Sequence, residues 1–177
     1  MTDRIPVTAF LLAVSATAFA AEQYTQTTFV GERLLVRTAD GGSFIPPLDD
    51  QQAEEDKRQV GFRDPRISPG GTIVGWLALY PNCCTSYPIP RELVLVKDGA
   101  VVRRIRGSGQ PIWKWRFSVD ETKVVFAQHP THGDFPVHYE LRDINTGTLL
   151  EEVDLEQLPD SANLPAWARG MDLGAVD

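Results

Sequence analysis

Short apolar runs separated by glycine-containing turns make up most of the chain. The run Leu93–Val96 is followed by Asp98-Gly99 and then by a second run, Ala100–Val102. Two apolar runs joined by an Asp-Gly pair are typical of a β-hairpin, because both turn residues tolerate positive φ angles. The same pattern predicts strands at Leu34–Thr38, Trp113–Phe117 and Val124–Phe126, with turns at Gly41-Gly42 and Thr146-Gly147.

Helical periodicity is scarce by comparison. The acidic stretch Asp49–Arg58 is compatible with one short helix, and Leu155–Met171 with a helical turn or two. The acidic stretch lacks the alternating ligands and central glycine of a calcium loop, so we interpret it as a solvated face. The chain is therefore predicted to be mainly β, with little helix.

A repeat is present within the chain. Arg66–Trp76 matches Arg116–Phe126 at an offset of 50 residues, with Arg, Ser, Thr and Val recurring and an aromatic residue closing each segment. Further on, Gly99 matches Gly147 at an offset of 48. Connecting loops tolerate length changes better than strands do, so we place this two-residue loss in the loop between the paired strands.

These repeats resemble a known family at their turns. Ile67-Ser68-Pro69-Gly70-Gly71 keeps most of an F-S-P-D-G motif but lacks its Asp, and Phe117-Ser118-Val119-Asp120-Glu121 lacks its Pro and Gly. With the later turn Asp143–Gly147, they are similar to TolB-like repeats of the Trp-Asp-type β-propeller family. The resemblance covers residues 66–105 and 116–153, with a partial third copy near 30–48. It implies propeller blades but no particular function, because such blades host many activities.

The length of the chain limits how many blades it can hold. At about 50 residues per unit, residues 21–177 accommodate about three blades, and closed propellers typically need four or more. We therefore predict an antiparallel meander of propeller-like blades that does not close; a small sandwich or barrel is the alternative. Exposed edges would then be covered by Asp49–Arg58 or by the tail Leu158–Asp177.

The N-terminus has the pattern of a secretory signal. Residues 5–21 carry no charged side chain, Arg4 precedes them, and Ala18-Phe19-Ala20 fits a cleavage site. We predict a signal peptide over residues 1–20 and a single domain over 21–177, with a tail from about 158, in the periplasm or outside the cell. An uncleaved anchor or a buried helix is the alternative. No later apolar run is long enough to span a membrane.

The composition of the chain limits the classes of partner that it can bind. The chain has 17 Lys and Arg against 24 Asp and Glu, a net charge of −7. This acidity argues against binding to nucleic acid or to an anionic lipid surface. Two cysteines are too few for a disulfide scaffold.

The two cysteines, Cys83 and Cys84, are adjacent within the loop Tyr80–Pro90. Cα atoms of neighbouring residues lie about 3.8 Å apart, whereas ordinary disulfides prefer about 4.4–6.8 Å. A Cys83–Cys84 disulfide would therefore be strained and easily reduced. The alternatives are a bridge that only stiffens the loop, or two partly buried thiols.

All three histidines lie in the equivalent loop of the second repeat, His129–His138. Equivalent loops of neighbouring blades lie at the same end, which places His129 and His132 near Cys83 and Cys84. Two thiolates and an imidazole suit copper or zinc, although adjacent cysteines are not standard zinc spacing. Solvent-exposed histidines are the simpler interpretation, and no other cofactor is predicted.

The strand Trp113–Phe117 alternates aromatic and basic residues. Trp113, Trp115 and Phe117 share one face, and Lys114 and Arg116 share the other. A core strand with a wet basic face is one interpretation, and an exposed stacking platform is the other.

No catalytic or phosphate-binding motif is present, so enzymatic activity is not predicted. We expect a non-catalytic module that binds a protein partner in the cell envelope. A metal-binding or thiol-redox protein is the alternative, and a hydrolase without a recognisable motif is a weaker one. The predicted contact residues are Tyr80, Tyr87, Phe135, Trp113 and Trp115.

Overall fold

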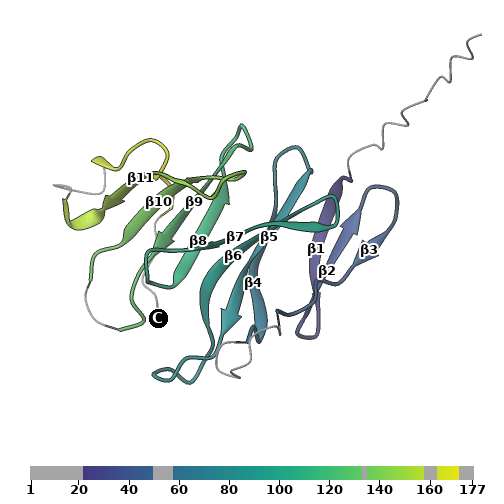
Figure 1. Cartoon of the computed structure of the whole chain (residues 1–177), viewed down its shortest axis with the longest axis horizontal. Coiled ribbons are helices and arrows are strands. Elements are labelled where there is room, and N and C mark those ends of the chain that lie inside the picture. The colour runs from purple at the N-terminus through teal and green to yellow at the C-terminus, as the bar shows by residue number, and fades with distance from the viewer. Residues whose placement is uncertain (1–21, 50–57, 133–134, 158–162, 172–177) are drawn as a thin grey trace, which may run out of the picture.

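The computed structural model describes residues 22–49, 58–132, 135–157 and 163–171. Their strands form three antiparallel sheets in which sequential strands are neighbours (Figure 1). The predicted signal peptide and most of the predicted helix Asp49–Arg58 lie outside the described residues. The N-terminal sheet holds β1 (Tyr24–Val30), β2 (Arg33–Thr38) and β3 (Ser43–Phe44); the middle sheet holds β4 (Gly61–Ile67), β5 (Ile73–Tyr80), β6 (Ile89–Lys97) and β7 (Ala100–Arg106); the C-terminal sheet holds β8 (Ile112–Phe117), β9 (Lys123–Gln128), β10 (His138–Asp143) and β11 (Leu149–Asp154).

The predicted meander is confirmed, and the described strands close into no barrel. The hairpin at Asp98-Gly99 is also confirmed, with positive φ at both residues. Helix is limited among the described elements to the 3-10 turn η2 (Leu155–Gln157), in agreement with the single turn or two expected in that stretch.

The three sheets stack in chain order, with apolar side chains between them. Val74 and Trp76 of β5 pack toward Leu34 and Val36 of the N-terminal sheet. On the opposite face of β5, Leu77 packs toward the C-terminal sheet. Because successive side chains of a strand point to opposite faces, one apolar strand can serve two cores. The middle sheet is therefore buried on both faces along β5.

Gly75 permits the closest approach between the middle and C-terminal sheets. A Cβ at this position would lie 2.7 Å from the Trp115 ring and 2.6 Å from the Leu95 side chain. The ring of Trp115 thus lies directly over the β5 backbone, and its indole N–H donates a 2.9 Å hydrogen bond to the carbonyl of Asp64. Phe117 contacts the same ring edge-on.

The repeated turns are linked to each other. In the second copy, Asp120 accepts a hydrogen bond from Ser118 within its own turn. The first copy has Gly70 at that position, and the carboxylate of Glu121 reaches across to accept hydrogen bonds from Ser68 and from the Gly70 amide. A neighbouring repeat therefore supplies the carboxylate that the first turn lacks.

The outer face of the C-terminal sheet is covered by residues 163–171, which we call the C-terminal strap. Leu164, Ala168 and Met171 pack there against the sheet residues Tyr139 and Leu141. Arg116 holds the strap by donating to the carbonyls of its residues Trp167 and Arg169 (2.8 and 3.2 Å). We predicted that the tail would cover an edge; this part of it covers a face.

Strand pairing corrects the predicted position of the length change. Ala78 pairs with Glu92, whereas Gln128, 50 positions after Ala78, pairs with His138, only 46 positions after Glu92. Four residues are therefore lost across the loop. The β10–β11 turn is two residues longer than the Asp98-Gly99 turn, so two of the four lost residues are regained there. The offset between Gly99 and Gly147 is therefore 48. The prediction of a single two-residue loss was wrong because compensating changes cancel in an ungapped comparison.

Candidate functional site

The β5–β6 loop and the β9–β10 loop meet at one end of the molecule. The imidazole of His132 donates a 3.1 Å hydrogen bond from Nε2 to the carbonyl oxygen of Cys84. We call residues 81–88 and 129–137 the paired loops; residues 133–134 lie outside the described part (Figure 1). The predicted proximity of the cysteine loop and the histidine loop is confirmed.

Cys83 and Cys84 are both exposed and carry free thiols, with their Sγ atoms 2.7 Å apart. The hydrogen bond to Cys83, together with its charge, raises the pKa of the Cys84 thiol. The turn around them is fixed by side chains, because Asn82 donates to the Thr85 hydroxyl and this hydroxyl donates to the carbonyl of Tyr87. The two sulfurs therefore lie at the surface of an ordered loop.

The four predicted metal ligands are not gathered into one site. The ring of His129 donates from Nδ1 to the adjacent Pro130 carbonyl (2.6 Å), and His132 contacts the cysteine loop through the backbone of Cys84. Across the residues with described positions, no three His, Cys, Asp or Glu side chains lie together as a metal site would need. The ring nitrogens are engaged with carbonyl oxygens instead.

Two of the five predicted contact residues are exposed on the paired loops. Tyr87 is 48% exposed and Phe135 is 58% exposed. Tyr87 also borders a shallow hollow of about 260 Å³, whose wall includes Val60 and Pro81. An apolar ring beside a concave surface is the arrangement that protein contacts use.

The other three predicted contact residues are buried, which corrects the prediction. Trp113 and Trp115 lie in the interior, and the Trp113 indole N–H donates 2.7 Å to the carbonyl of His129. Tyr80 donates from its hydroxyl to Glu92 (2.9 Å), and burial, reinforced by that carboxylate, raises the pKa of the tyrosine hydroxyl. Trp113 and Tyr80 therefore lie beneath the loops, Trp115 packs between the sheets, and the three rings offer no exposed stacking platform.

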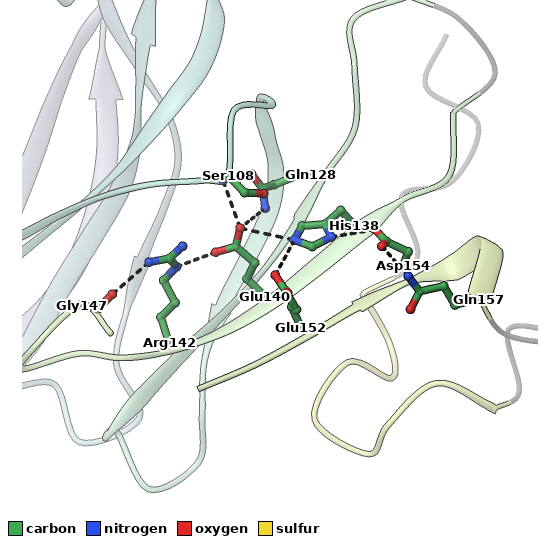
Figure 2. A network of polar contacts seen from close by, with 9 residues as sticks. All are labelled: Ser108, Gln128, His138, Glu140, Arg142, Gly147, Glu152, Asp154 and Gln157. Carbon is green, nitrogen blue, oxygen red and sulfur yellow. Dashed lines mark hydrogen bonds and ion pairs between the residues drawn. The ribbon is translucent and has the colours of Figure 1, made fainter. Parts of the chain in front are cut away.

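A buried polar network lies at the base of the second loop, and sequence reasoning missed it (Figure 2). Glu140 of β10 is fully buried and accepts hydrogen bonds from the Gln128 amide (2.7 Å), the Ser108 backbone N–H (3.0 Å) and Arg142. Burial by itself raises the pKa of Glu140, but the bonds from Arg142 and Gln128 outweigh it, so the pKa lies below its ordinary value. Glu140 is therefore a charged anchor inside the protein.

His138 extends this network toward the chain that follows the sheet. Its Nδ1 lies 2.7 Å from Asp154, and its Nε2 lies 3.4 Å from Glu140 and 3.6 Å from Glu152. Gln157 of η2 donates to the other oxygen of Asp154. Figure 2 shows the imidazole between the carboxylates of β10 and β11. Because His138 directly follows residues 129–137, these contacts fix the end of the second loop.

A second buried carboxylate fixes the base of the first loop. Glu92 lies near the start of β6 and accepts hydrogen bonds of 2.9 Å each from Tyr80, Arg104 and Arg106. Burial raises its pKa, and the bonds from Arg106 and Tyr80 more than reverse that effect. Each of the paired loops thus returns into a strand that carries a buried, hydrogen-bonded acid.

A glycine makes room for the second network. A Cβ at Gly107 would lie only 1.7 Å from the side-chain oxygen of Gln128, which is closer than two such atoms can approach.

The sequence contains a signal for the first network, the one around Glu92. Glu92 shares its strand face with Val94 and Val96, so an acid at that position should have been predicted as buried and paired.

The networks and the exposed groups have different chemical capacities. Glu92 and Glu140 are committed to arginine, tyrosine and amide partners inside the protein, which suits anchoring rather than proton transfer. The exposed groups of the paired loops are aromatic rings and two thiols. This end of the molecule can therefore make apolar contacts and undergo thiol chemistry.

No family model and no curated protein matches the sequence. Among solved structures, one titled as a eukaryotic initiation factor is similar over 76% of this chain, with 13% sequence identity and a TM-score of 0.49. The match spans 30% of that protein's chain. Within the residues that the structure describes, no helix has the length and apolar character needed to cross a membrane.

Proposed function

We propose that this protein is a non-catalytic binding module that recognises a protein partner through the paired loops. The observation that carries the proposal is the hydrogen bond from His132 to Cys84, which joins two loops bearing the exposed rings of Tyr87 and Phe135. Tyrosine and phenylalanine provide large contact areas at low entropic cost, so they contribute strongly to protein interfaces.

Order in the loops supports this function. Glu92 and Glu140 hold the strands into which the loops return, and the turn at Asn82–Thr85 is hydrogen-bonded internally. A loop that is ordered before binding loses less conformational entropy when it binds. The paired loops are therefore suited to present a preformed surface.

The compartment and family are part of the same proposal. The secretory pattern of residues 1–20 supports a partner in the cell envelope, and the negative charge argues against nucleic acid. The turn motifs at Ser68 and Ser118 support an assignment of the sheets to TolB-like blades. Proteins with such blades differ widely in activity, so the paired loops determine the partner.

Site-specific cross-linking tests the proposal. A photo-reactive amino acid is placed at Tyr87 or Phe135 in the full chain expressed in its own cells. Val119, 91% exposed in the β8–β9 turn at the opposite end of the sheet, is the matched control. We expect the same discrete cross-linked protein from Tyr87 and Phe135, and none from Val119. Identical products from all three positions, or none from the paired loops, would contradict the proposal.

A further inference from the structure

The two thiols lie at the contact between the paired loops. Cys83 and Cys84 are exposed, their sulfurs are neighbours, and the backbone carbonyl of Cys84 is the atom that His132 contacts. A change in the backbone torsions of Cys84 therefore moves the atom that joins the loops. No other cysteine is present in the chain to compete for a bridge.

We propose that Cys83 and Cys84 form a thiol–disulfide exchange site whose substrates are disulfide compounds, and whose oxidation separates the paired loops. One cysteine thiolate attacks the external disulfide, which breaks the external S–S bond, forms a mixed disulfide and releases one thiol. The second cysteine then attacks the mixed disulfide, closes the Cys83–Cys84 bond and releases the second thiol. Two electrons and two protons pass from the cysteines to the external disulfide, which is reduced to two thiols.

Backbone geometry couples this bond to the loops. Neighbouring Cα atoms are about 3.8 Å apart across a trans peptide, below the usual disulfide range of about 4.4–6.8 Å. Closing the ring therefore requires a change in the backbone between Cys83 and Cys84. The carbonyl that accepts from His132 belongs to the next peptide, Cys84–Thr85, and is attached to the same Cα of Cys84, so a rotation at Cys84 moves it. We expect the carbonyl to turn away and the contact to be lost.

The environment of the thiols sets the conditions for exchange. The raised pKa of Cys84 lowers its thiolate fraction near neutral pH, and the thiolate is the reactive form. Oxidation is therefore expected to accelerate as pH rises above neutrality. The site is reactive because it is exposed, since both side chains lie at the surface.

The first test measures the bond. The reduced full chain is incubated with oxidised glutathione and analysed by intact mass and by size-exclusion chromatography. We expect a loss of two hydrogens, unchanged oligomeric state and complete loss of maleimide labelling, all restored by a reductant. Stable glutathione adducts, disulfide-linked dimers or an unchanged mass would each overturn the exchange site. Cys83→Ser is the control, and it should stop at the mixed disulfide.

The second test measures the coupling to His132. The imidazole proton signals are recorded by NMR before and after oxidation, and the His132 signal is assigned by its absence in His132→Ala. We expect that signal to shift on oxidation in the wild-type chain and to stay unchanged under the same treatment in the Cys83→Ser/Cys84→Ser double variant, which has no thiol to react. A formed Cys83–Cys84 bond with an unmoved His132 signal would overturn the separation of the loops.

The consequence for partner binding rests on the proposed function, whereas both tests above need no partner. If cross-linking at Tyr87 and Phe135 fails while the bond forms and the His132 signal shifts, only the binding function is wrong. If cross-linking succeeds but its yield is the same in oxidised and reduced protein, the redox control of binding is wrong and the binding function stands.

Discussion

The middle and C-terminal sheets have the same strand order but carry the acidic residue on different strands at one equivalent ladder position. Glu92 of β6 pairs directly across the ladder with Arg106, whereas His138 of β10 pairs directly with Asp154. At this ladder position the inner strand carries the acid in the middle sheet, and the outer strand carries it in the C-terminal sheet. The comparison indicates that the base of each loop requires a complementary polar pair. Either strand of the ladder can carry the acidic member of that pair.

The two sheets differ also in how deeply the arginine partners of their buried acids are enclosed. Glu140 is fully buried, and its partner Arg142 is only 18% exposed at its side chain. Arg106, one of the partners of Glu92, is 71% exposed. A charge left without its partner is costly in the interior but is readily hydrated at the surface. The two acids should therefore respond differently to removal.

The largest expected effect is the loss of Glu140. We expect Glu140→Ala to lower the free energy of unfolding by about 3–5 kcal/mol, because the mostly buried Arg142 loses its carboxylate partner. Glu92→Ala should cost about 2 kcal/mol, since water can reach its arginine partners. Urea unfolding at pH 7 measures both. Equal losses would show that the enclosure of the partner does not distinguish the sheets.

The next effect comes from steric crowding in the C-terminal sheet network. Gly107→Ala places a methyl group on the Gln128 side chain and should cost about 2 kcal/mol. Gly61→Ala, whose methyl group would lie 3.4 Å from Leu79, is the matched control and should change stability little. Adding Gln128→Ala to Gly107→Ala should recover part of the loss. An additive double variant would refute the steric explanation.

Exchanging the charges tests the equivalence of the two ladder positions. His138→Glu places a fourth carboxylate beside Glu140, Glu152 and Asp154 and should destabilise the chain. Combining it with Asp154→Arg recreates the acid–arginine pair of the middle sheet. The two substitutions should show a favourable coupling of about 1 kcal/mol or more in a double-mutant cycle. A coupling near zero would mean that the position is not interchangeable.

The smallest effect is on the pH dependence of stability. Glu92 and Glu140 have folded-state pKa values below the ordinary carboxyl value of 4.5. Such groups add stability that is fully present above the unfolded pKa and is lost as pH falls through the folded pKa. Stability should therefore decline below about pH 5, and Glu140→Gln should flatten that decline in urea unfolding measured from pH 6 to 3. An unchanged slope would mean that Glu140 is not ionised in the folded protein.

Local sequence signals predicted much of the fold. The Asp98-Gly99 hairpin depends on two residues and their flanking apolar runs, and the repeat brought the cysteine and histidine loops to one end. Both inferences rest on interactions close in sequence or on symmetry between copies. They hold because turn chemistry and repeat geometry do not depend on how the core is packed.

The burial of particular side chains could not be predicted in the same way. Tyr80 borders the first loop in sequence and Trp113 lies in a strand of alternating aromatic and basic residues, yet both side chains are buried. Glu140 is buried because Gln128, Ser108 and Arg142 converge on it from three segments. Such convergence arises from the tertiary arrangement, so it cannot be predicted from the hydrophobic pattern of one strand.

The C-terminal strap limits how this architecture can evolve. Leu164, Ala168 and Met171 occupy the face on which a fourth sheet would stack. A duplication placed after β11 would have to displace the strap and the bonds that Arg116 makes to it. A new sheet inserted between the existing sheets would leave the strap intact. Duplication directly after β11 is therefore expected to be less favourable than insertion of a sheet between the existing ones.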